Sequence, residues 1–161
     1  MNALAKPQVG KYLNASFVSS FQKVGTFTIA GGQKQGGNVA SYFCTPDGRV
    51  LHAIAGPVNA ATFLREARWV VETYKLAQLE HPRDAAALKA FFWQAHAERL
   101  RQEHGLDLAA GAGPRRALAP QGQVHLILAA APLVKIEQVY KLVFEKVLGE
   151  KVSTAPVVQG G

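Results

Sequence analysis

The chain has 161 residues, of which 48% are hydrophobic and 18% are charged, and it carries a net charge of +7. This length lies within the range of one domain, and the apolar fraction excludes a wholly disordered chain. The single cysteine, Cys44, excludes an intrachain disulfide and a zinc site built from several cysteines.

Neither a signal peptide nor a membrane span is predicted. Residues 1–7 contain no apolar stretch of signal-peptide length, and the longest apolar run, residues 126–134, is far shorter than the about 20 residues that a spanning helix needs. We expect a soluble protein that is cytoplasmic by default, while secretion through a removed signal peptide stays open.

The first part of the chain predicts a short helix followed by a β-rich region. A helix is expected to end near residue 13, and the Phe, Val and Thr content of residues 17–27 indicates one or two strands. The glycine-rich residues 31–37 predict a mobile loop. Residues 39–55 predict a β-hairpin, because two apolar runs flank a Pro-Asp-Gly turn.

The rest of the chain predicts helices. Asn59 is a candidate N-cap for a helix over residues 60–79, and Gly105 is expected to end a second helix that begins near residue 84. Residues 107–122 are expected to form a linker, and residues 150–161 a tail. Residues 124–128 fit either a strand or a helix, whereas the apolar periodicity of residues 136–148 predicts a helix.

A resemblance to a known family rests on the hairpin and its surroundings. The residues that carry it are Asn38 to Cys44, the turn Pro46-Asp47-Gly48-Arg49, the strand Val50 to Ala55, the pair Gly56-Pro57 and the helix that follows. Over residues of about 9–78, this order resembles the later part of a thioredoxin-like domain. The resemblance implies an α/β (α+β) fold with a partial sheet in residues 1–80 and a helical extension in residues 81–149.

Two departures from that family bear on activity. No Cys-x-x-Cys motif is present, and Gly37-Asn38-Val39 occupies the position where the family places a cis-proline. The resemblance therefore implies a redox-inactive module. Residues 123–131 could fill the central strand position of the family, as could a partner chain, but we favour an all-helical C-terminal half.

Cys44 and His52 are the candidate catalytic residues. They lie on opposite strands of the expected hairpin, so a thiol–imidazole pair is conceivable if the register brings them together. We favour core packing for Cys44, because free cysteines are among the most buried residues.

No metal site or cofactor is predicted. His96 and His104 are eight residues apart, wider than the spacing of about three to five that helical zinc ligands use, so we interpret them as surface histidines beside Glu103. The loop that contains Lys34 matches neither the phosphate-binding nor the dinucleotide-binding glycine pattern.

The favoured hypothesis is a non-catalytic thioredoxin-like module for protein interaction or self-association. The first alternative is an enzyme, a single-cysteine thiol redox protein that uses Cys44. The second is binding of a polyanion such as nucleic acid, with Lys34 and Arg49 as candidate contacts, because residues 1–62 carry +4 of the net charge.

Overall fold

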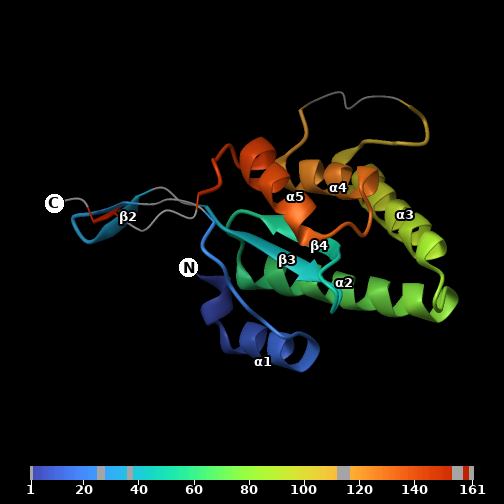
Figure 1. Cartoon of the computed structure of the whole chain (residues 1–161), viewed down its shortest axis with the longest axis horizontal. Helices are drawn as coiled ribbons and strands as arrows, with labels where there is room; N and C mark the ends of the chain where they lie inside the picture. Colours follow the sequence, from blue (N-terminus) through green and yellow to red (C-terminus); the bar gives the residue numbers. More distant parts are fainter. Residues whose placement is uncertain (1, 25–27, 36–37, 112–116, 154–157, 160–161) are drawn as a thin grey trace.

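The computed structural model describes residues 2–24, 28–35, 38–111, 117–153 and 158–159, and its fold is mixed α/β (Figure 1). The chain begins with a short 3₁₀ helix, η1 (Ala3–Ala5). The strands are β1 (Thr28–Ala30), β2 (Gln33–Gln35), β3 (Ala40–Cys44), β4 (Val50–Ala55) and β5 (Val158–Gln159). The longer helices are α1 (Pro7–Ser16), α2 (Ala60–Glu80), α3 (Ala85–His104), α4 (Pro120–Ala130) and α5 (Ile136–Leu142), and a π-helical turn, η2 (Val143–Val147), extends α5.

The centre of the molecule is the antiparallel hairpin of β3 and β4. Phe43 lies opposite His52 in the register, and a bulge follows between Phe43 and Cys44. Because side chains alternate across a strand, Phe43 and His52 share one face of the hairpin, and Tyr42 and Cys44 lie on the other.

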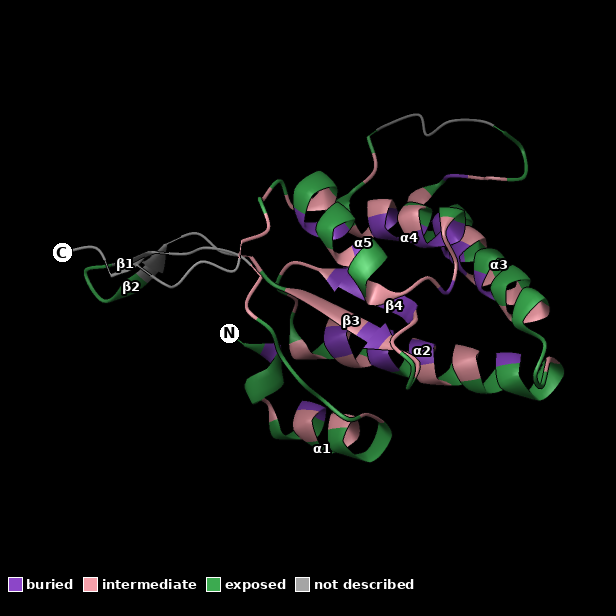
Figure 2. Ribbon diagram, viewed as in Figure 1, coloured by how far each residue is buried: buried purple, intermediate pink, exposed green. Residues whose placement is uncertain are grey.

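Helices cover both faces of this hairpin, so that it forms the middle of three layers (Figures 1 and 2). The face of Phe43 packs with α1 and α2, where Val9, Phe63 and Val70 are buried. The other face packs with α4, α5 and η2, through the buried residues Val50, Ala53, Val124, Leu128, Val139 and Val143. Residues of the expected helical extension therefore share a core with the hairpin.

Several expected elements are confirmed, with the caps that the sequence indicates. The side chain of Asn59 accepts a hydrogen bond from the backbone N–H of Thr62 at the start of α2. Asp84 caps α3 in the same way, and Gly105 ends that helix with a positive φ of 65°. None of the helices in the described part of the chain is long and apolar enough to cross a membrane.

Four expectations need correction. Residues 31–37 are not simply a loop, because residues 33–35 form β2 and pair with β1. Residues 17–24 form no strand, and residues 25–27 lie outside the described part of the chain. Residues 123–130 belong to α4, so the suggestion that this segment supplies a central strand is wrong. Within the expected tail, β5 pairs in parallel with β1, which also pairs with β2.

Candidate functional site

The two candidate catalytic residues are not brought together. Cys44 packs on the face covered by α4 and α5, whereas His52 lies on the opposite face, where its ring stacks on Phe43. Burial, followed by the nearby charge of Glu137, raises the pKa of the Cys44 thiol to about 11. At neutral pH this thiol is therefore overwhelmingly protonated, and the thiolate is the form that nucleophilic chemistry requires.

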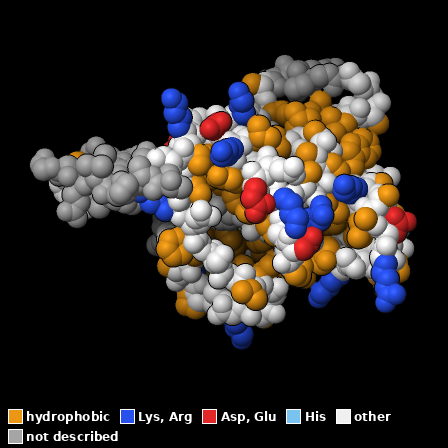
Figure 3. All heavy atoms as spheres, viewed as in Figure 1, with side chains coloured by type: hydrophobic (Ala, Val, Ile, Leu, Met, Phe, Trp, Pro, Cys, Tyr) orange, Lys and Arg blue, Asp and Glu red, His pale blue; other side chains and the backbone are white. Residues whose placement is uncertain are grey.

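The two candidate contacts for an anion lie at opposite ends of β3 (Figure 1). Lys34 belongs to β2, in the arm that projects from the body. Arg49 follows the hairpin turn, where its guanidinium donates to the carboxylate of Asp47 and to the carbonyl of Leu133. On the face seen in Figure 3, Lys and Arg side chains are spread among acidic ones instead of forming one patch.

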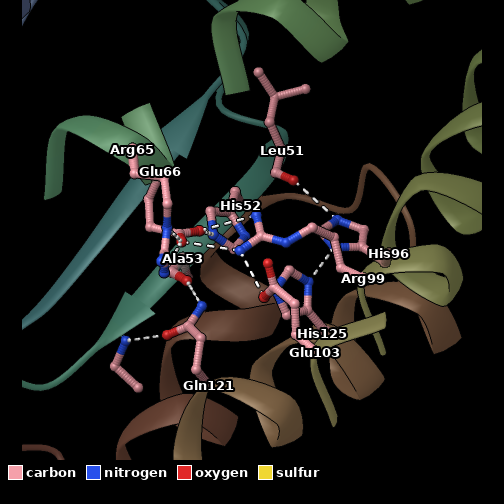
Figure 4. A network of polar contacts seen from close by, with 11 residues as sticks. Leu51, His52, Ala53, Arg65, Glu66, His96, Arg99, Glu103, Gln121 and His125 are labelled. Carbon is pink, nitrogen blue, oxygen red and sulfur yellow. Dashed lines mark hydrogen bonds and ion pairs between the residues drawn. The ribbon is translucent and has the colours of Figure 1, made fainter. Parts of the chain in front are cut away.

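The sequence analysis missed a buried polar network around His52 (Figure 4). Nε2 of His52 lies 2.8 Å from Oε2 of Glu66, a carboxylate on the apolar side of α2. Arg99 of α3 donates to both oxygens of that carboxylate, and Arg65 reaches Oε1 from the surface. Burial alone would raise the pKa of Glu66, but the hydrogen bonds from His52 and Arg99 outweigh it and hold the pKa below its usual range.

Two further buried histidines lie beside His52. Nε2 of His96 is 3.0 Å from the carbonyl oxygen of Leu51, and its Nδ1 is 2.9 Å from Nδ1 of His125. Burial lowers the pKa of His96 to about 3, and it lowers the pKa values of His52 and His125 as well. All three imidazoles are therefore neutral at pH 7.

The hydrogen-bond partners fix the proton on each neutral ring. A carbonyl and a carboxylate only accept, so His96 and His52 each carry the proton on Nε2 and a lone pair on Nδ1. His125 then donates from Nδ1 to His96, which leaves a lone pair on its own Nε2. Nδ1 of His52 and Nε2 of His125 are buried without any hydrogen-bond partner among the described residues.

Side chains from α3 and α4 close the outer edge of β4. The side-chain amide of Gln121 bonds to the β4 backbone as a neighbouring strand would. Its oxygen accepts from the N–H of Ala55, and its nitrogen donates to the carbonyl of Ala53. The carbonyl of Leu51 accepts from His96, and the N–H of Val50 donates to the carbonyl of Val134. This edge is therefore satisfied within the chain.

The outer edge of β3 is different. Gly56 donates to the carbonyl of Val39, and from this bond the alternation of an antiparallel ladder directs the backbone groups of Ala40, Tyr42 and Cys44 away from β4. In the described parts of the chain, no group pairs with these outward N–H and C=O groups. On the face of the molecule drawn in Figure 3, hydrophobic side chains lie in a hollow near the middle. Figure 1, in the same view, places the outer side of β3 there.

The interpretation of His96 as a surface histidine is wrong, because the residue is 1% exposed. The spacing argument compared two residues on one helix, whereas the structure gathers His52, His96 and His125 from β4, α3 and α4. One sequence signal could have found the network: Glu66 is a charged residue between Phe63, Ala67 and Val70 on the apolar face of α2.

Comparison with known proteins identifies no relative: no family model, no curated protein and no solved structure matches this chain.

Proposed function

We propose that this protein is a non-catalytic interaction module that binds an extended segment of a partner polypeptide along the outer edge of β3. The observation that supports this proposal is the contrast between the two edges of the hairpin. The outer edge of β4 is closed by Gln121 and His96, whereas the outward backbone groups of Ala40, Tyr42 and Cys44 have no partner in the described chain.

The surroundings of β3 favour an added strand. An unpaired edge presents a row of backbone donors and acceptors that another extended segment can complete, and strand addition is a common mode of peptide recognition. Helix α1 packs beside α2 in the layer below the hairpin, and Phe17, just after α1, contacts Phe43. This helical layer offers an apolar surface on which a further strand can lie.

The same surroundings define the chemistry of the partner segment. A strand added between two helical layers has both faces buried, so its middle should be apolar on both faces, as in the central strands of covered sheets. Val18 and Phe21, which follow Phe17 in the chain and are fully exposed, offer further apolar surface. The net charge of +7 favours acidic residues on the flanks of the partner segment.

A displayed peptide library, selected on the folded protein, provides the test. Ala40→Pro removes one outward N–H and leaves the bonds between β3 and β4, since the N–H of Ala40 does not point at β4. Ala40→Val is the matched control, because it keeps the N–H and adds comparable bulk. Selected peptides should be apolar and β-forming, and Ala40→Pro should weaken their binding by about fivefold, as expected for loss of a backbone hydrogen bond worth about 1 kcal/mol.

Other outcomes would contradict this proposal. Peptides that bind the two Ala40 variants equally, or failure to select any peptide, would show that the β3 edge is not the binding surface. Disulfide reduction that is lost in Cys44→Ala would favour the thiol redox alternative. Salt-sensitive binding of heparin or nucleic acid, reduced by substitution of Lys34 or Arg49, would favour the polyanion alternative.

A further inference from the structure

We propose that His52, His96 and His125 form a binding site for a single divalent transition-metal ion such as Zn²⁺. One ring nitrogen from each residue lies within 4.8 Å of one ring nitrogen from each of the other two. All three side chains are at most 1% exposed, and they come from three different elements. This site is separate from the edge of β3 and does not depend on peptide binding.

The donor set fits such an ion chemically. Neutral imidazole is a good ligand for zinc, copper and nickel, and it must be deprotonated at the ligating nitrogen. His52 already holds a buried ring nitrogen, Nδ1, without a partner. An unpaired polar atom in a core carries a cost in free energy, and a metal bond would remove that cost.

The outer contacts of two of the rings match those of metal-bound histidines. Such a ring donates its other N–H to a carboxylate or a backbone carbonyl, which fixes its orientation. His52 makes this bond to Glu66, and His96 makes it to the carbonyl oxygen of Leu51. In both rings the remaining nitrogen, Nδ1, bears the lone pair.

Binding requires the ring of His52 to move closer and the rings of His96 and His125 to separate slightly, since the ligand atoms start within 4.8 Å of one another. Bonds of about 2.0–2.1 Å to a tetrahedral zinc ion place its ligand atoms about 3.3 Å apart. The Nδ1 atoms of His96 and His125 are already 2.9 Å apart. Binding would replace the hydrogen bond between these two rings with two metal bonds, and the proton on Nδ1 of His125 would move to Nε2 of the same ring. Three protein ligands leave the fourth position for water.

Two surface hollows lie against residues of the polar network, and we expect an ion to enter from one of them. One has a volume of about 360 Å³ and is lined by Trp69 and Arg99, and the other has a volume of about 300 Å³ and is lined by Glu66 and Gln121. Arg65 lines both hollows, and its side chain is 66% exposed. The positive charge of Arg99 is balanced by its ion pairs with Glu66 and Glu103.

A second set of potential ligands lies beside the three histidines and could hold the metal ion instead. Glu103, His104 and His125 also bring one ligand atom each within 4.8 Å of one another. Because His125 belongs to both groups, substitutions of His52 and His104 distinguish the two positions.

The test is titration of the full chain, freed of metal by a chelator, with Zn²⁺ in a calorimeter and with Co²⁺ in a visible spectrometer. We expect one ion per chain and the absorption of a tetrahedral Co²⁺ centre. His52→Gln and His96→Gln should weaken binding by about 100-fold or more, and Glu66→Gln by about tenfold. The control is His81→Gln, which changes a partly exposed histidine between α2 and α3 and should leave binding unchanged.

X-ray absorption spectroscopy of the zinc-loaded wild-type protein identifies the atoms bound to the ion. This measurement does not require any variant to fold. We expect a nitrogen shell with the outer scattering of imidazole rings. A shell of oxygen alone, absence of binding by the wild type, or equal weakening by His81→Gln would overturn the proposal. Loss of binding in His104→Gln with normal binding in His52→Gln would place the ion in the neighbouring group and would also overturn it.

Discussion

His52 and Glu66 form a buried contact in which Nε2 of the imidazole lies 2.8 Å from Oε2 of the carboxylate, with side-chain exposures of 0% and 2%. Because burial keeps His52 neutral, it donates a hydrogen bond to a charged carboxylate, and Arg99 supplies the balancing charge. The hairpin, α2 and α3 are therefore joined through one buried anion.

Removal of Arg99 should be strongly destabilising. Arg99→Met leaves the carboxylate of Glu66 buried without its main counter-charge, which is expected to cost about 3–5 kcal/mol in free energy of unfolding. Arg65→Met is the matched control, because Arg65 contacts the same carboxylate from an exposed position and should cost less than about 1 kcal/mol. Urea unfolding of the two variants measures the difference, and equal losses would contradict this account.

Stability should fall as the pH is lowered below about 6.5. In the unfolded chain the three histidines take up protons near this pH, whereas in the folded chain their pKa values are depressed, that of His96 to about 3. The unfolded chain therefore binds more protons. His96 should remove up to about 1.4 kcal/mol of stability per pH unit in this window, and the lowered pKa values of His52 and His125 add to the loss.

Chemical unfolding of metal-free protein between pH 7.5 and 4.5 checks this dependence. The pKa of Glu66 is also depressed, so protonation of its carboxylate adds to the loss only at still lower pH. A folded His125→Gln variant should show a shallower slope than the wild type. A stability that does not change between pH 7 and 5 would show that the histidines are not held neutral.

Gln121 should protect the outer edge of β4. Gln121→Ala removes two hydrogen bonds to the backbone of this edge and is expected to cost about 1–3 kcal/mol. Amide exchange at Ala55 should become faster, because its N–H loses its acceptor. Gln123→Ala, also on α4, bonds outside the hairpin and serves as the control for exchange at Ala55.

Cys44 should react slowly with thiol reagents at neutral pH. Burial raises its pKa to about 11, so the thiolate is scarce at pH 7 and the rate of alkylation should keep rising well above pH 9. The pH profile of iodoacetamide labelling measures this. A plateau near pH 7 would indicate an activated thiolate and would favour the redox alternative.

Local signals were sufficient for the hairpin and for several helix ends. The Pro-Asp-Gly turn predicts the hairpin, and the caps at Asn59 and Gly105 act through atoms close to them in the chain. The prediction of a strand over residues 17–24 was wrong because it used local composition alone. Their β-forming composition is local, but a strand also needs a neighbour to pair with, and β3 pairs only with β4 in the described chain.

The buried network could not be predicted in the same way, because its members meet only through tertiary packing. His96 and His125 are 29 residues apart, and Arg99 is 33 residues from Glu66. The alternation of polar and apolar residues does not show which helix will lie against β4. The charged Glu66 on an apolar helix face was the one local signal of a buried polar site.

Amide hydrogen exchange, measured residue by residue with and without a selected peptide, tests the proposed binding edge most directly. In the free protein, the amides of Ala40, Tyr42 and Cys44 should exchange fast, while those of Ser41 and Phe43 should be protected by β4. Peptide binding should slow the three outward amides and leave the other two unchanged. Outward amides that are already protected in the free protein, or that gain no protection when the peptide binds, would contradict the account.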